Sequence, residues 1–463
     1  MVLACFAVLA LAGPASGQTD ARGRIIDKVV CRADATQSYA LYVPAGYTAE
    51  RKWPVILCFD PGARGLVPVE RLQAAAEKYG YIVAGSLNSR NGPYEANLTA
   101  AQAMATDLGT RLRLDRDRVY TAGLSGGARV ATQLALLGLA KGVIACSAGF
   151  PDPTDGVPLH LAFPFFATSG TDDFNQLELK QLDELLEERK AAHRLTIFNG
   201  GHEWAPATLL GEAVEWLELQ ARRAGTVPKN DPMVQAAWQE RVGTLPAAAG
   251  PERWRALQAL TADFNGLMDT TAFEQEAKIL GSSREVKQWQ KSERALLKRE
   301  QSEREELNEL AMNGSPAAIQ KRAAQLRQAA DGVPDSAEHQ MARREIAGFT
   351  MNARDLTRVA FEQEEYASAA GMLEMMAALR PGQSRTYYDL ARARALDGDR
   401  KRALAALKQA VEAGYGDRPR VQAEPAFKKL AGDAAFQDLL GKMNPTGEPG
   451  PTEAGAPEGS RRP

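Results

Sequence analysis

A short glycine-rich stretch at residues 119–128 constrains the fold of this chain more than any other feature. Residues 119–122 read Val-Tyr-Thr-Ala, which is typical of a β-strand, and the residues that follow Gly126 have the composition of a helix. Between them stands Gly-Leu-Ser-Gly-Gly at residues 123–127. A strand that turns straight into a helix leaves room only for small side chains two residues before and two residues after the turning residue. The stretch therefore predicts a sharp strand-to-helix turn that presents Ser125 at the start of the helix.

The region around this turn alternates short apolar runs with helical patterns. Seven runs between Tyr39 and Phe198 are rich in β-branched or aromatic residues, and five helical patterns lie between or after them. This order predicts an α/β domain over residues 20–225, built on a doubly wound, mostly parallel sheet. Ligands of such sheets bind beyond the carboxyl ends of the strands, so we expect the chemistry in the loops that follow the strands.

A serine at such a turn needs a base before it can act as a nucleophile at neutral pH. The chain has four histidines, which are His160, His193, His202 and His339. His202 comes after the last predicted strand and before the final helix of the α/β region, where the catalytic histidine of such folds belongs. The other three lie in a Pro-rich connection, at the start of a strand and in the helical half. We therefore predict Ser125 as the nucleophile and His202 as its base.

The carboxylate that orients the histidine is expected between these two residues, after the penultimate strand. The segment at residues 166–173 ends in Asp172 and Asp173, and both are candidates. The aspartate that does not contact the histidine is expected to cap the helix that begins near Gln176.

An acyl-transfer site also needs amides that stabilise the developing oxyanion. One is expected from Gly126, the residue after the serine, and the other from the loop after an early strand, at residues 59–65. Because Pro61 has no N–H, the second donor must be Gly62 or Ala63, and we favour Gly62. A Pro-Gly turn without any catalytic part is the alternative.

Four segments, at residues 39–44, 117–127, 170–173 and 201–204, together carry a family resemblance. They resemble the α/β-hydrolase superfamily, and within it the polyhydroxybutyrate depolymerases and the feruloyl or acetylxylan esterases. The resemblance implies a serine esterase with a Ser-His-Asp triad, and in such hydrolases the acid commonly falls three residues after the loop glycine, which favours Asp173. The family usually carries His-Gly in the oxyanion loop where this chain has Asp60-Pro61. We expect Asp60 to turn away from the oxyanion and to hold its loop by hydrogen bonds.

The charge balance and the motifs limit the ligands. With 56 Lys plus Arg against 58 Asp plus Glu, the chain has no large positive field for nucleic acid or anionic lipid. It contains no phosphate-cradling loop, dinucleotide fingerprint or metal-ligand spacing, so we expect no cofactor and no metal. The expected substrate is a small-molecule or polymer ester.

The cysteines imply no disulfide framework. Cys5 lies in an N-terminal segment that is expected to be removed, as described below, and the three cysteines that remain have no C-x-x-C spacing.

The N-terminus has the features of an export signal. Residues 2–12 are an uninterrupted apolar run, followed by Gly-Pro and small residues. This pattern predicts a cleaved signal peptide over residues 1–17 and a secreted or periplasmic protein. The run is far shorter than the roughly 20 residues of a membrane span. Residues 2–5 also resemble a lipoprotein cleavage box, so lipid anchoring is a lesser alternative.

The second half of the chain has helical patterns only. Residues 226–235 indicate a linker, residues 236–346 predict amphipathic helices, and the Pro- and Gly-rich tail at residues 444–463 is expected to be disordered. Between them, at residues 347–443, a period of 34 residues relates Leu356, Ala369, Leu373 and Pro381 to Leu390, Ala403, Leu407 and Tyr415. This period resembles tetratricopeptide repeats, with residues 427–440 as a cap, and it implies a region that binds a protein partner.

Two further hypotheses follow from the same residues. A serine peptidase would use the same triad on amides, and only the family resemblance favours esters. Alternatively, an inactive hydrolase-like scaffold would bind a partner through its helical repeats. Hydrolase-like chains that have lost their activity usually lack one of the triad residues. Every triad position has a candidate here, which favours an active enzyme.

Overall fold

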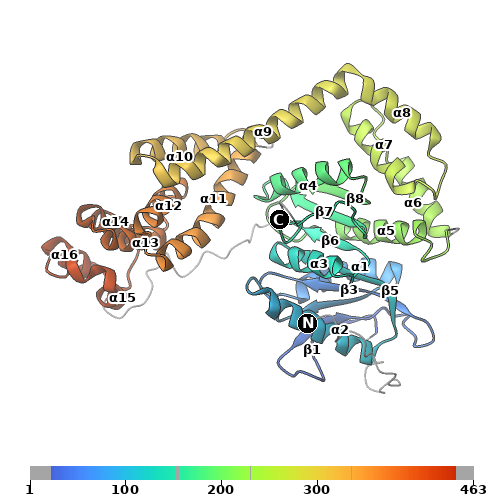
Figure 1. Ribbon diagram of the computed structural model, residues 1–463, viewed down its shortest axis with the longest axis horizontal. Helices are drawn as coiled ribbons and strands as arrows, with labels where there is room; N and C mark the ends of the chain where they lie inside the picture. The colour runs from blue at the N-terminus through green and yellow to red at the C-terminus, as the bar shows by residue number, and fades with distance from the viewer. Residues whose placement is uncertain (1–21, 153–155, 230, 335, 445–463) are drawn as a thin grey trace. The chain divides into compact units, whose positions relative to one another are not determined.

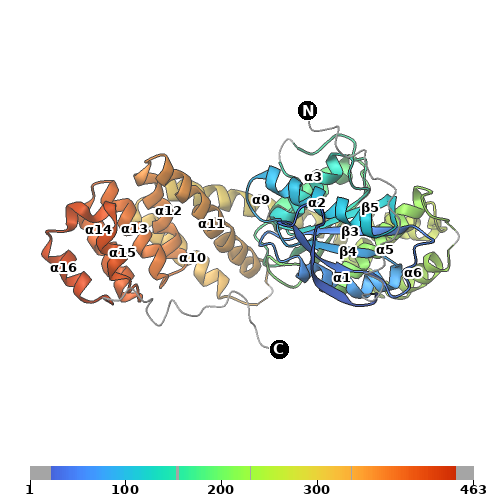
Figure 2. The same ribbon diagram turned by 90° about the horizontal axis from the view of Figure 1, so that it is seen from below.

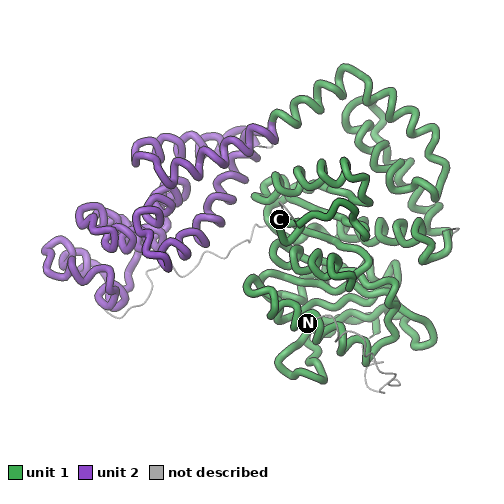
Figure 3. The backbone as a smooth tube through the Cα atoms, viewed as in Figure 1, with its two compact units in different colours: residues 1–295 green, residues 296–463 purple. Residues whose placement is uncertain are grey.

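The computed structural model describes residues 22–152, 156–229, 231–334 and 336–444. The predicted signal segment at 1–17 and nearly all of the predicted tail lie outside these residues. The chain divides into two compact units, residues 1–295 and 296–463, which Figure 3 shows in different colours. The boundary falls within helix α9 (Arg284–Asn313).

The first unit is built on an eight-stranded sheet in the order β1-β2-β4-β3-β5-β6-β7-β8. Strand β2 runs antiparallel to β1 and β4, and all the other neighbouring strands are parallel. This is the order of the α/β-hydrolase fold, and it confirms the predicted fold class. The strands are β1 (Ile25–Val30), β2 (Ser38–Tyr42), β3 (Trp53–Phe59), β4 (Ile82–Ser86), β5 (Leu114–Leu124), β6 (Val143–Cys146), β7 (Phe165–Gly170) and β8 (His193–Phe198).

Helices cover both faces of this sheet (Figures 1 and 2). Helices α1 (Leu66–Tyr79) and α5 (Ala207–Arg223) bury apolar side chains against one face. Helices α2 (Tyr94–Arg111), α3 (Gly126–Leu136) and α4 (Gln176–Glu188) cover the other face. Every residue of β3 is buried as a result, which explains its continuous apolar sequence. The cysteines at 31, 58 and 146 are buried free thiols.

Three further helices belong to the first unit, which are α6 (Pro232–Gly243), α7 (Pro251–Phe264) and α8 (Thr271–Ser282). Helix α6 begins inside the predicted linker, because the Asp231 side chain accepts a hydrogen bond from the Met233 amide and Pro232 occupies the first turn. Leu219 of α5 packs in one small core with residues of α6 and α7. The predicted helical region 236–346 is therefore divided between the two units.

In its described residues the second unit is built of helices and has no strand, as predicted. It contains the end of α9, then α10 (Pro316–Ala330), α11 (Ala337–Glu362), α12 (Tyr366–Leu379), α13 (Ser384–Leu396), α14 (Arg400–Glu412), α15 (Arg418–Ala423), the 3-10 helix η2 (Pro425–Leu430) and α16 (Ala434–Gly441). Leu373, Leu390 and Leu407 of the predicted repeat are buried in its core. Leu356 is 49% exposed, because the buried face of α11 carries the neighbouring Ala353 and Thr357 instead. No helix in the described parts of the chain is long and apolar enough to span a membrane.

The glycines of the strand-to-helix turn are required by close backbone contacts. A Cβ atom on Gly123 would lie 2.1 Å from the carbonyl oxygen of Gly127. A Cβ atom on Gly127 would lie 2.1 Å from the carbonyl oxygen of Phe59, at the end of β3. Both distances are far below van der Waals contact, which confirms that the turn between β5 and α3 admits only glycine at these positions.

Replacing Gly127 by alanine is expected to lower the free energy of unfolding by about 1–3 kcal/mol or more, because the new methyl group meets a backbone oxygen. Gly211 is the matched control, since it also lies in a helix but its Cβ atom would meet only the Ala75 Cβ at 4.0 Å. Gly211→Ala is expected to raise the stability by about 0.5–1 kcal/mol through helix propensity. Denaturant unfolding followed by circular dichroism measures both changes, and equal effects of the two substitutions would contradict the close-contact account.

Candidate active site

Four loops at the carboxyl ends of parallel strands carry the predicted site residues. Asp60 follows β3, Ser125 follows β5, Asp173 comes after β7, and His202 comes after β8. Parallel strands end at the same edge of a sheet. The fold therefore gathers at one edge residues that are far apart in the sequence.

Ser125 occupies a strained backbone position at the start of α3. Its φ of 53° and ψ of −123° fall in a region that L-residues rarely adopt. The Ser125 amide donates a hydrogen bond of 2.8 Å to the Cys146 carbonyl at the end of β6, which ties the turn to the sheet. Such a position holds the hydroxyl at a helix N-terminus, where backbone amides favour negative charge.

His202 is held by a buried carboxylate. Its Nδ1 lies 2.8 Å from Oδ1 of Asp173, whose side chain is fully buried. Asp173 also accepts hydrogen bonds from the Asn175 amide at 2.9 Å and from the Ser169 hydroxyl at 3.2 Å. These contacts fix the carboxylate, and the carboxylate orients the imidazole through Nδ1. The Phe174 ring stacks on the imidazole with centroids 4.0 Å apart.

The two aspartates of this loop have different surroundings. Helix α4 begins at Gln176 as expected, and its N-cap is Asn175, whose side chain makes no capping hydrogen bond. The expectation that Asp172 is the N-cap is therefore wrong, because Asp172 lies three residues before the capping position. The Asp172 amide donates to the Gly200 carbonyl at 2.9 Å, which joins the aspartate loop to the histidine loop through the backbone.

The serine and the histidine are not hydrogen-bonded to each other. Among the described residues, the ring of His202 is bonded to Asp173 and no hydrogen bond joins it to Ser125. Catalytic hydrogen bonds are often long in enzymes without substrate and shorten when substrate binds. The structure thus brings together two of the three predicted triad residues and leaves the third at the same sheet edge.

The two predicted oxyanion donors differ in their availability. The Gly126 amide has no hydrogen-bond acceptor among the described residues. The Gly62 amide donates to Oδ1 of Asp60 at 2.8 Å, and the Ala63 amide donates to the Asp60 carbonyl at 3.1 Å. The Gly62 amide, which the sequence favours as the second oxyanion donor, is thus already bonded to a neighbouring carboxylate.

Asp60 connects the loop after β3 to the histidine loop. Its fully buried carboxylate accepts from the guanidinium of Arg64 at 2.9 and 3.1 Å and from the indole Nε1 of Trp204 at 2.8 Å. Burial alone would raise the pKa of Asp60, but the hydrogen bonds from Arg64, Trp204 and Gly62 outweigh it and lower the pKa. The expectation that Asp60 holds its loop by hydrogen bonds is confirmed.

Two contacts of the histidine loop were not predicted from the sequence. Arg71 Nη1 donates to the carbonyls of Trp204 and Ala205 at 2.7 and 2.9 Å. Phe174 stacks on the imidazole of His202. The position of Phe174 directly after Asp173 is the one signal in the sequence, whereas nothing near Arg71 indicates its distant partners.

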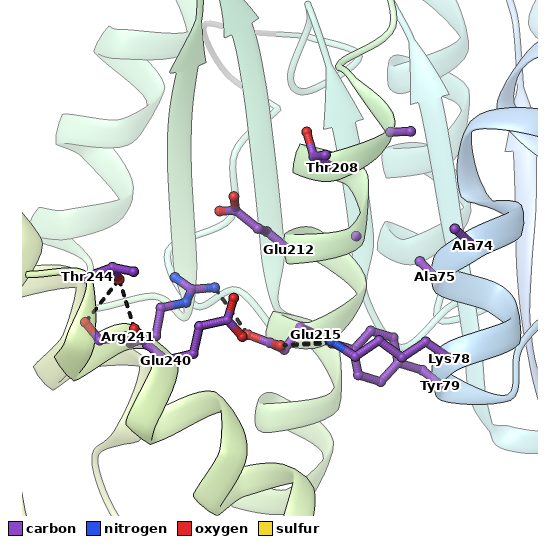
Figure 4. Close-up of a pocket in the computed structure, with 12 residues that line it drawn as sticks. Ala74, Ala75, Lys78, Tyr79, Thr208, Glu212, Glu215, Glu240, Arg241 and Thr244 are labelled. Carbon is purple, nitrogen blue, oxygen red and sulfur yellow. Dashed lines mark hydrogen bonds and ion pairs between the residues drawn. The ribbon is translucent and has the colours of Figure 1, made fainter.

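A cavity of about 650 Å³ lies elsewhere on the first unit, between α1, α5 and α6 (Figure 4). Its charged residues are partly paired, since Glu215 lies close to Lys78, Tyr79 and Arg241. The loop residues that carry Ser125 and His202 do not line this cavity. In the described ranges of the chain, no group of three or more His, Cys, Asp and Glu residues could hold a metal ion.

Comparisons with known proteins give similar solved structures only. No family model and no curated protein matches the chain. An esterase from Pyrobaculum calidifontis is 15% identical with a TM-score of 0.33, over 43% of this chain and 85% of that one. Esterase B from Lactobacillus rhamnosis is 16% identical with a TM-score of 0.33, over 44% and 90%. The fluorophosphonate-binding serine hydrolase FphF of Staphylococcus aureus is 12% identical with a TM-score of 0.33, over 39% and 92%. A likeness at this level says nothing about activity, and the fold assignment rests on the strand order and directions.

Replacing Asp60 by alanine is expected to destabilise the first unit by about 1–3 kcal/mol, because the Trp204 indole and the Gly62 amide lose their acceptor. Asp60→Asn keeps one carbonyl oxygen as an acceptor, so it should lower the free energy of unfolding by less. Since the pKa of Asp60 is lowered in the folded chain, its contribution is present above the ordinary carboxyl pKa of about 4 and is lost as the pH falls through the folded value. Unfolding curves of the wild type and Asp60→Ala at pH 7 and pH 3 measure this contribution. An equal decrease in the free energy of unfolding at both pH values would contradict the lowered pKa of Asp60.

Proposed function

We propose that this chain is a serine hydrolase that cleaves carboxylic esters through an acyl-enzyme intermediate. The observation that carries the proposal is the 2.8 Å hydrogen bond between His202 and the fully buried Asp173. A buried carboxylate that orients an imidazole is the arrangement that general-base activation of a serine requires. The strained position of Ser125 at the same sheet edge supports its role as the nucleophile.

In the acylation step, the Oγ of Ser125 forms a bond to the carbonyl carbon of the ester. The Nε2 of His202 accepts the hydroxyl proton, and the hydrogen bond from Nδ1 to Asp173 stabilises the resulting imidazolium. The electron pair of the carbonyl double bond moves to its oxygen, where the Gly126 amide donates a hydrogen bond. The bond to the alkoxy oxygen then breaks, and the alcohol leaves with the proton from His202.

In the deacylation step, a water molecule takes the place of the alcohol. His202 accepts a proton from the water as its oxygen attacks the acyl carbon, and it returns this proton to the Oγ of Ser125 when the carboxylic acid leaves. The chain's own residues therefore complete the cycle without a cofactor. Asp173 keeps the same hydrogen bond throughout and does not itself exchange a proton.

The remaining parts of the proposal concern the two ends of the chain. Residues 1–17 are proposed to act as a cleaved export signal, so that the enzyme is secreted or periplasmic. Helices α11 to α14 are proposed to form tetratricopeptide-like repeats that bind a protein partner. Support for this comes from the start points of α12 and α14, at Tyr366 and Arg400, which reproduce the period of the sequence repeat.

Hydrolysis of short-chain nitrophenyl esters by the full chain tests the proposal. The wild type should turn over these esters, and Ser125→Ala should lower kcat by about 10³-fold or more, because the nucleophile is removed. Ser302→Ala is the matched control, since Ser302 is an exposed serine on α9 and should leave the rate unchanged.

The same assay separates the two other hypotheses. Nitroanilides with the same acyl group report peptidase-type activity, and turnover of the anilide by the wild type that is lost in Ser125→Ala would favour the peptidase. Equal rates in the wild type and Ser125→Ala, with both proteins folded by circular dichroism, would contradict the enzyme and favour a scaffold without activity.

A further inference from the structure

The two amides of the loop after β3 that were expected to serve the oxyanion are both occupied. Both amides that could serve, those of Gly62 and Ala63, already donate to Asp60. The Arg64 amide also lies 3.3 Å from Oδ1 of Asp60. Stabilising a tetrahedral oxyanion with the Gly126 amide alone would lose one of the two donors that such sites normally supply.

The side chain of Asn91 lies against the Cα of Gly126, the residue whose amide is the remaining donor. A Cβ atom built on Gly126 would be 2.0 Å from Oδ1 of Asn91 and 3.8 Å from its Nδ2. The Asn91 carboxamide therefore covers Gly126, the residue that follows the nucleophile. Within the described chain this carboxamide makes no hydrogen bond, so rotation about its Cβ–Cγ bond can present either the oxygen or the NH₂ group.

The backbone that carries Asn91 is held on two sides. Its amide donates to the Pro61 carbonyl at 2.9 Å, which joins this loop to the oxyanion loop. The buried Asn97 accepts from the Arg90 amide at 2.9 Å and donates to the Arg90 carbonyl at 3.0 Å. Because the neighbouring residues are fixed in this way, the Asn91 side chain starts from a defined position beside Gly126.

We propose that the Asn91 side-chain NH₂ group supplies the second hydrogen bond to the oxyanion, in place of a backbone amide of the loop after β3. This inference rests on the proposed esterase function. When Ser125 attacks, the carbonyl oxygen gains negative charge beside Gly126 and accepts from the Gly126 amide and from Nδ2 of Asn91. The bond forms mainly in the transition state, because the ester oxygen carries little charge before attack.

The test measures steady-state kinetics of Asn91→Ala and Asn91→Asp in the full chain with a short-chain nitrophenyl ester. Asn91→Ala should lower kcat about 10²-fold with little change in KM, because the lost hydrogen bond belongs to the transition state. Asn91→Asp should be at least as impaired, since a carboxylate opposes the oxyanion. Asn352→Ala is the matched control, an exposed asparagine on α11 that should leave kcat unchanged.

An aryl trifluoromethyl ketone gives a readout that a purely structural role would not change. It forms a tetrahedral adduct with the serine, so its inhibition constant should rise in Asn91→Ala by about the same factor as kcat/KM falls. Asn91→Asp is nearly isosteric and keeps the test valid if the alanine variant does not fold.

The outcomes separate this inference from the proposed function. Turnover by the wild type together with unimpaired Asn91→Ala or Asn91→Asp overturns the role of Asn91 and leaves the esterase intact. A loss of kcat without a matching loss of inhibitor affinity also overturns it, because the residue would then act only on the fold. Absence of turnover in the folded wild type overturns the proposed function, and the role of Asn91 fails with it.

Discussion

The site depends on a close backbone approach that only glycine allows. Strand β5 reaches its end, reverses at Ser125 and continues as α3 within a space where Cβ atoms on Gly123 and Gly127 would lie 2.1 Å from carbonyl oxygens. This crowding forces Ser125 to a positive φ and puts its hydroxyl at the start of a helix. The same contact joins α3 to the end of β3, so that the serine and the loop of Asp60 share one edge of the sheet.

The second element of the site is the carboxylate of Asp60. By accepting from Trp204 it links the loop after β3 to the loop that carries His202, and Arg71 holds the same loop from α1. The other oxygen of the same carboxylate accepts from the Gly62 amide, which the sequence favours as the second oxyanion donor. The proposed role of Asn91 supplies a donor from a different loop.

Much of the fold could be predicted because strands that are buried on both faces appear as continuous apolar runs, as in β3. Strand β1 lacks this pattern, since it lies at the sheet edge and exposes Asp27 and Lys28. The contact between Asp173 and His202 could be expected because each residue follows a strand in a chain with few histidines. The occupied amide of Gly62 could not, because hydrogen bonds within a folded loop leave no trace in residue spacing.

The central claim is that Ser125 is an activated nucleophile, and labelling by a fluorophosphonate tests it most directly. The full chain is treated with the reagent, digested, and the modified peptide is identified by mass spectrometry. The account predicts one adduct, on Ser125, which is lost when His202 is replaced by alanine. A folded chain without any adduct, or with an adduct on another residue, would contradict it.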